Sequence, residues 1–234
     1  MEYLNENVMI GSGEGDDIDV STASIESQLI ALEDRYKELP QNVNIVEKAF
    51  MELQMARLMI GVERKKDSWS IARQVLDIFL SESEWEKAVD ACDVMFLSEQ
   101  GNTLSALGQG IWLAVTYPID PELTVALLQH VIDDTPDDAD GAAVAAATAV
   151  YITELRADDE KKDNLLFFAN QMLGQVARRH SNVETQEQFD QWIEKMELSD
   201  PARFLVRLRN VVDVLVQDEW LFDRDELQNN LPVN

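Results

Sequence analysis

Histidine and cysteine, which often carry acid–base, metal or nucleophilic chemistry, are few in this sequence and stand apart. The chain contains His130, His180 and a single cysteine, Cys92. A nucleophile needs a base within reach, and a metal site needs several ligands at fixed spacing. Neither histidine belongs to an H-x-x-x-H, E-x-x-H or cysteine-containing pattern. We therefore predict that both histidines lie near helix C-termini, where the dipole favours a cation, and that Cys92 is a buried structural thiol.

An acid-rich segment, residues 133–141, is the best candidate for a cation site. Five of its nine residues are aspartates, and it ends at Gly141. With that glycine at the turn, an EF-hand loop requires an acidic residue at position 136 and a glutamate at 147. These positions hold Pro136 and Ala147, so the motif fails. We expect a solvated loop there, and the sequence as a whole predicts neither a metal nor a cofactor.

Motifs that identify common enzyme classes are absent from the sequence. It contains no Walker loop, no G-x-S-x-G elbow and no C-x-x-C pair. Carboxylates are so abundant that no single pair of them indicates acid–base catalysis. We therefore expect a protein that is not an enzyme. One alternative stays open, an enzyme or ligand binder with a site among the helices, lined by Trp85, Trp112 and Tyr117.

Two groups of residues have a spacing suited to binding a protein partner. Met51, Met55 and Met59 recur once per helical turn. Such a stripe can be core, but flexible thioether side chains also suit an adaptable docking groove. Arg203 and Arg207 stand one turn apart, without a carboxylate four residues before or after the pair. They either pair with acids of other helices or form a patch that recognises an acidic partner.

The charge balance restricts the class of partner. With 45 acidic and 19 basic residues, the chain has a formal net charge of −26. Direct binding to a phosphate backbone requires clustered lysine and arginine, so it is not expected. An acidic surface suits a basic protein partner. The alternative is an inhibitor that mimics a nucleic acid and occupies the site of a DNA- or RNA-binding protein. The oligomeric state stays open.

The elements that must position these residues are predicted to be helices. From Ser24 onward, apolar residues recur at spacings of three and four, and proline or glycine punctuates the runs. Helix starts are predicted by three signals, Asp120-Pro121, Asp200-Pro201 and a capping box from Ser83 to Glu86. The alanine-rich run 142–149 predicts a central, closely packed helix.

The predicted fold class is all-α, with about ten helices. They form either an irregular multi-helix bundle or a degenerate, solenoid-like stack of helical hairpins. Residues 1–23 are polar and acidic and are predicted to be a flexible tail. Residues 24–234 are predicted to be one helical domain, in which a C-terminal subdomain could begin near residue 158.

A protein–protein interaction module is the function that these observations favour. It would act as an adaptor, an assembly chaperone or a regulator. The sequence lacks a run of about 18 apolar residues, so no membrane span is expected. The N-terminus lacks the pattern of a signal peptide, and we therefore expect a cytoplasmic protein.

Overall fold

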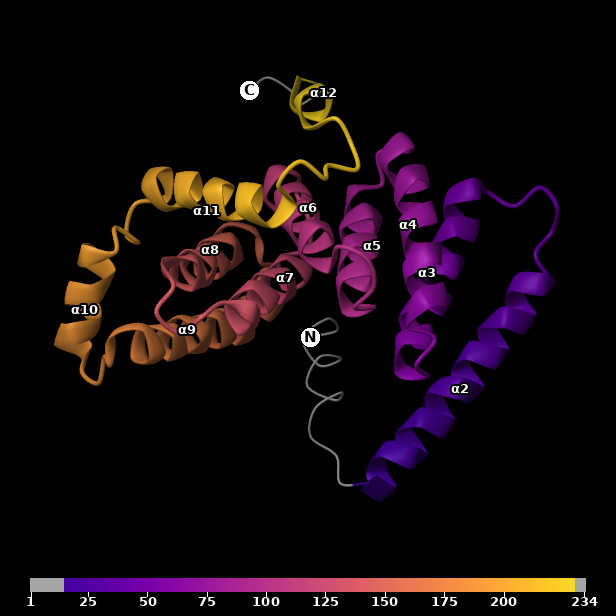
Figure 1. The fold of residues 1–234 in the computed structure, drawn as a ribbon, viewed down its shortest axis with the longest axis horizontal. Helices are drawn as coiled ribbons and strands as arrows, with labels where there is room; N and C mark the ends of the chain where they lie inside the picture. Colours follow the sequence, from indigo (N-terminus) through magenta and orange to yellow (C-terminus); the bar gives the residue numbers. More distant parts are fainter. Residues whose placement is uncertain (1–14, 230–234) are drawn as a thin grey trace.

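All regular elements in residues 15–229, the part of the chain that the computed structural model describes, are α-helices. The predicted all-α class is confirmed, and the helices pack against one another as a multi-helix bundle (Figure 1). The helices are α2 (Gly15–Lys37), α3 (Ile45–Gly61), α4 (Lys65–Ser81), α5 (Trp85–Leu97), α6 (Thr103–Thr116), α7 (Pro121–Asp134), α8 (Asp140–Arg156), α9 (Asp159–Ser181), α10 (Gln186–Lys195), α11 (Pro201–Val216) and α12 (Arg224–Asn229).

Most helices pack against their neighbours in sequence, which makes the molecule a row. Each helix from α2 to α9 packs on the next one along the chain. Figure 1 shows α2 as the outlying helix at one end of this row and α10 at the other. α11 then returns across α6 and α8, and it joins segments far apart in sequence. The row is thus closed into a bundle in its second half and is open at the α2 end.

Two glycines of α6 let its neighbours approach closely. A Cβ added at Gly108 would lie 2.7 Å from Val216 Cγ2 of α11. A Cβ added at Gly110 would lie 2.9 Å from the Cβ of Cys92 in α5. Cβ atoms in contact normally stay well beyond 3 Å, so only glycine fits at these crossings without displacement. α6 therefore packs closely against α5 on one side and against α11 on another.

The alanine-rich helix lies where the sequence predicts it. In α8, the alanines from Ala142 to Ala149 are buried, and the helix packs against α7, α9 and α11. Small side chains let three neighbouring helices come close to the same backbone. α8 is consequently a central element of the main core.

A helix begins at each of the three predicted starts, and two of the three predicted caps are confirmed. The Asp120 side chain accepts a hydrogen bond from the N–H of Glu122, and the Asp200 side chain accepts one from Ala202. The capping box at Ser83 is wrong, because that residue has φ 58° and lies in the turn that ends α4, while Glu84 precedes α5 without a side-chain cap. A capping box of that kind occurs instead at Thr185, which opens α10.

The predicted boundary of the N-terminal tail stays a prediction. Residues 1–14 lie outside the described part of the chain, whereas residues 15–23 belong to α2. Across the helices that the structure describes, none combines the length and apolar character that crossing a bilayer would demand.

Candidate functional site

The end of the row formed by α2 and α3 has a small apolar cluster of its own. Leu29 of α2 meets Met55 and Met59 of α3, and these side chains are 3%, 6% and 4% exposed. They form a set of buried residues distinct from the main core. Around them lie the partly buried side chains of Leu32, Tyr36, Leu58, Val62 and Ile71. We call this set the methionine cluster.

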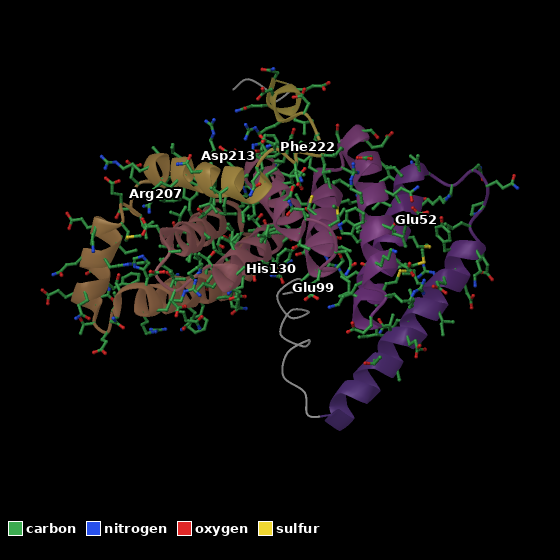
Figure 2. All side chains as sticks on the ribbon, in the orientation of Figure 1. Glu52, Glu99, His130, Arg207, Asp213 and Phe222 are labelled. Atoms are coloured by element: carbon green, nitrogen blue, oxygen red, sulfur yellow. The ribbon has the colours of Figure 1, made fainter. Side chains whose placement is uncertain are left out.

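α2 is attached to the body by few contacts. Among its residues from 22 onward, Leu29 is the one that is buried. The polar contacts between α2 and the neighbouring helices include a hydrogen bond that Tyr36 Oη donates to Glu52 of α3, and an ion pair at 3.2 Å between Glu33 and Arg64, just before α4. Glu52 is labelled at this end of the molecule in Figure 2. A helix that buries only Leu29 among its residues 22–37 is a weakly docked element over that stretch.

The structure brings two of the three candidate methionines together. Met55 and Met59 lie beneath α2, while Met51 is half-buried and lies outside the methionine cluster. The surface of α3 that they form therefore already receives a helix, and that helix is α2. This geometry is the one by which an amphipathic helix occupies an apolar groove.

The opposite face of α3 is fixed to the body by a buried ionic network. Arg57 pairs with Asp90 and, at 2.8 Å, with Asp93, both from α5. His130 of α7 places its Nε2 atom 3.1 Å from the other Asp93 oxygen, and its ring lies 4.6 Å from that of Phe96. His130 lies one turn before the end of α7, near the helix C-terminus as predicted, but a carboxylate from a neighbouring helix holds its imidazole.

The electrostatics of this network follow from burial and from its own charges. Burial disfavours a charged Arg57, but the two aspartates outweigh burial and hold its pKa above the ordinary value. For Asp93, burial is outweighed by Arg57 and by the hydrogen bond with His130, so its pKa lies below the ordinary value. Burial wins at Asp90, whose pKa is raised even though Arg57 is close. The network is a cross-link between α3, α5 and α7.

Reasoning from the sequence missed this network. The available signal was Asp93, a carboxylate between apolar residues of a buried stripe (Cys92, Val94 and Met95). Such a residue needs a buried partner. The identity of that partner was out of reach, because Arg57 is 36 residues away.

Arg203 and Arg207 both have carboxylate partners within the chain. Arg203 pairs with Glu197 and, at 3.6 Å, with Asp200. Arg207 pairs with Asp140 at 3.0 Å, at the start of α8. Their role in binding an acidic partner stays a prediction, and the geometry favours the alternative of pairing with acids of this chain.

Arg207 also belongs to a group of three arginines that cap neighbouring helices. Its guanidinium donates to the carbonyl of Met196 at the end of α10. Arg156 donates to Ala114 and Val115 at the end of α6, and Arg179 donates to Ile132 near the end of α7. Each arginine satisfies carbonyls that a helix leaves unpaired and meets the negative end of its dipole. These basic residues therefore connect helices.

Cys92 and His180 lie as the sequence predicts. Cys92 is fully buried, and burial raises the pKa of its thiol to about 12. His180 is in the last turn of α9, with Nε2 3.3 Å from Asp140. Within residues 15–229, no group of three or more His, Cys, Asp or Glu side chains is placed to hold a metal ion.

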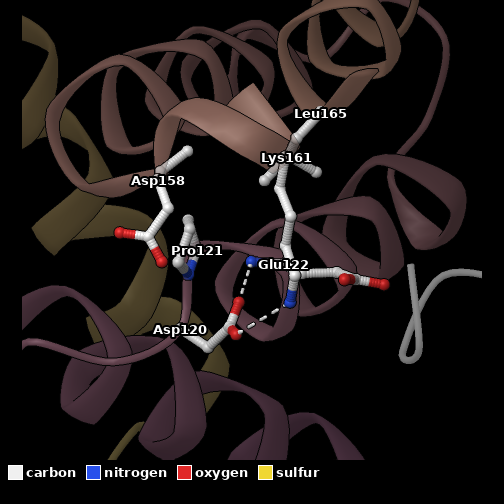
Figure 3. Close-up of a pocket in the computed structure, with 7 residues that line it drawn as sticks. Asp120, Pro121, Glu122, Asp158, Lys161 and Leu165 are labelled. Atoms are coloured by element: carbon white, nitrogen blue, oxygen red, sulfur yellow. Dashed lines mark hydrogen bonds and ion pairs between the residues drawn. The ribbon is translucent and has the colours of Figure 1, made fainter. Parts of the chain in front are cut away.

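A small hollow lies between the start of α7 and the start of α9 (Figure 3). Its empty space of about 330 Å³ includes open solvent, so the enclosed part is much smaller. Among its polar groups, Asp120 caps α7 and lies 4.0 Å from Lys161. Trp85 and Tyr117 lie elsewhere and are stacked on each other at 3.9 Å. The aromatic residues considered for an interhelical site therefore pack against protein.

Comparison with protein-family models, with curated protein sequences and with solved structures found no match for this chain.

Proposed function

We propose that this protein is a protein–protein interaction module, acting as an adaptor, an assembly chaperone or a regulator, and that the α3 face of the methionine cluster is its partner-binding surface. The observation that carries the proposal is α2 itself. It lies on Met55 and Met59 as a partner helix would, with Leu29 as its one buried residue among those described from 22 onward. A partner that supplies a helix with a larger apolar stripe replaces α2 on this surface.

The rest of the molecule suits a module that holds this surface in place. α3 is anchored from behind by Arg57 and its two aspartates, so the methionine face stays fixed when α2 leaves. Methionine side chains adapt to differently shaped apolar partners because they are long, unbranched and polarizable. A net charge of −26 favours a partner helix with basic residues around its apolar stripe.

Two substitutions with opposite expected effects test the proposal. Leu29→Glu removes the apolar contact that holds α2, so the methionine face is exposed more often and capture of a partner from native lysate increases. Met55→Glu places a charge in the receiving surface, so capture of the same partner is lost. The measurement is quantitative mass spectrometry of the polypeptides retained by each tagged variant.

A control substitution separates this surface from unspecific charge effects. Phe167→Glu adds the same charge on α9, where the phenylalanine is already 68% exposed, and it should leave capture unchanged. A partner that is retained by Met55→Glu, or lost with Leu29→Glu, contradicts the assignment of the site. Circular dichroism on each variant checks that the helices have formed.

A further inference from the structure

The chain turns back on itself after α11 and lies along α6. Residues 217–222, which we call the C-terminal strap, connect α11 to the region of α12 without helical structure of their own. In Figure 1 the strap runs from the end of α11 past α6 towards α12. Side chains on one face of α6 hold the strap. They belong to Asn102, Ser105, Gln109 and Trp112.

A single buried side chain of α6 binds the backbone of the strap at two points. The carboxamide of Gln109 donates to the carbonyl of Glu219 at 3.3 Å and accepts from the N–H of Leu221 at 2.7 Å. The hydroxyl of Ser105 donates to the same Glu219 carbonyl at 3.1 Å. Gln109 is fully buried, so these bonds are partly shielded from water even though Glu219 itself is exposed. This is the manner in which a protein holds an extended peptide.

Side chains of the strap add selectivity to this backbone recognition. Trp220 and Phe222 both pack on Trp112, with ring centroids 6.1 Å and 5.6 Å away. Asn102 at the start of α6 donates to the carboxylate of Glu219 at 2.6 Å. Trp220 and Phe222 are half-buried by these contacts, and aromatic anchors often dominate the energetics of peptide and protein interfaces. The α6 face is therefore a complete docking site for this segment.

The backbone is strained where the strap leaves α11. Gln217 has φ 53° and ψ −125°, which combines a positive φ with a ψ far from the left-handed helical well. This backbone conformation is unfavourable for every residue except glycine. The turn follows directly on Val216, which meets Gly108 of α6, and it directs the strap onto Gln109 of the same helix. An extended Gln217 would relieve the strain, and it would carry the strap away from that site.

We propose that two copies of this chain exchange their straps, so that each strap docks on α6 of the other copy. The strap from the other copy has the same sequence as the strap that docks on α6 in the monomer, so all contacts of the strap are retained. Exchange relieves the strain at both Gln217 residues, whereas the closed monomer keeps it. A short strained hinge followed by a well-docked terminal segment favours such an exchange. This surface is separate from the methionine cluster, and the inference does not depend on the proposed function.

The first test is the oligomeric state of the full chain between micromolar and millimolar concentration, by size-exclusion chromatography with light scattering. Closure within one chain has a high effective concentration, so the dimer forms at the upper end of this range. Its fraction rises with salt, because two copies of charge −26 repel each other. Gln217→Gly removes the strain and weakens dimerisation at least tenfold. Gln217→Ala is the matched control, since alanine retains the backbone penalty, and it keeps the dimer.

A mixing experiment tests whether the strap is the exchanged segment. Gln109→Ala disables the docking site and keeps the strap, while Trp220→Ala disables the strap and keeps the docking site. Neither variant forms a dimer alone, and their mixture forms a heterodimer through the one intact strap and the one intact site. Circular dichroism confirms that both variants are folded. A wild-type protein that stays monomeric throughout, or a dimer unchanged by Gln217→Gly or by Trp220→Ala, would overturn the proposal.

Discussion

The helices α2 and α8 differ in what attaches them to the molecule, although both are long. α2 has 23 residues, and of those described from 22 onward Leu29 is buried. α8 has 17 residues, of which ten are buried. Because most helix stability in proteins comes from tertiary packing, length alone says little about how firmly a helix is held.

The composition of the two helices explains the contrast. α8 is rich in alanine and is surrounded by α7, α9 and α11. α2 carries mostly polar side chains and packs chiefly against α3. The comparison therefore distinguishes a tightly packed body from a peripheral helix, and α2 can leave without opening the main core.

The largest expected effect comes from breaking the ionic network of the body. Asp93→Ala leaves Arg57 buried with a single carboxylate partner from the network, and it is expected to lower the free energy of unfolding by about 3–5 kcal/mol. The measurement is urea denaturation followed by circular dichroism. Asp77→Ala is the matched control, since it removes an exposed i,i+4 partner of Arg73 and should cost less than about 0.5 kcal/mol. Equal costs for the two variants would contradict the assignment of the network as a structural anchor.

The same enlargement of an alanine should have different consequences in the two helices. Ala145→Leu adds three carbons at a fully buried position of α8 and should lower the stability by about 1–3 kcal/mol. Ala31→Leu makes the same change on an exposed face of α2, where stability should change by less than about 0.5 kcal/mol. Denaturation curves of the pair measure the contrast. A tolerated Ala145→Leu would mean that α8 is less tightly packed than the structure shows.

A truncation in α2 should act locally. Leu29→Ala is expected to favour the detached state of α2 by about 2 kcal/mol, because it removes the buried side chain that holds the helix. Backbone amides of α2 then exchange hydrogen faster, while those of α8 keep their wild-type rates. Hydrogen exchange with mass spectrometry reads both helices in one sample. Ile30→Ala, at a 56% exposed position, is the control, and a parallel rise in α8 would show that α2 belongs to the cooperative body.

At neutral pH the smallest expected effect is that of the Cys92 thiol, whose titration matters only at alkaline pH. Burial raises the pKa of the Cys92 thiol from 9.0 to about 12, so the folded state binds this proton more tightly than the unfolded chain does. This contribution to stability is complete below pH 9 and is lost as the pH rises from 9 towards 12. The melting temperature of the wild type should therefore fall relative to that of Cys92→Ala over this range. A constant difference between the two curves would show that the thiol is accessible in the folded state.

Local signals in the sequence account for much of the fold. The helical period from Ser24 onward gives the all-α class, and the Asp-Pro pairs at 120 and 200 begin α7 and α11 as expected. These features depend on residues within one or two turns, so the sequence alone reveals them. Ser83 shows the limit of such signals, since a serine followed three residues later by a glutamate also occurs where one helix ends.

The candidate site could be predicted in part. The spacing of Met55 and Met59 places both on one face of a helix, and the structure confirms that they lie together. The sequence did not predict which element covers that face. Leu29, the α2 side chain that meets both methionines, belongs to a separate helix, and the apolar period of that helix is like that of the others.

The set of helices, several of their ends, the central alanine helix and the acidic character of the chain can all be deduced from the order of residues. Three-dimensional packing was needed to establish that His130 meets Asp93, that arginines such as Arg156 cap helices distant in sequence, and that Gln109 holds the C-terminal strap. The physical reason is the distance along the sequence between the residues that interact. A helix is encoded by the period and caps of its own residues, whereas a buried pair requires two segments that only packing brings together.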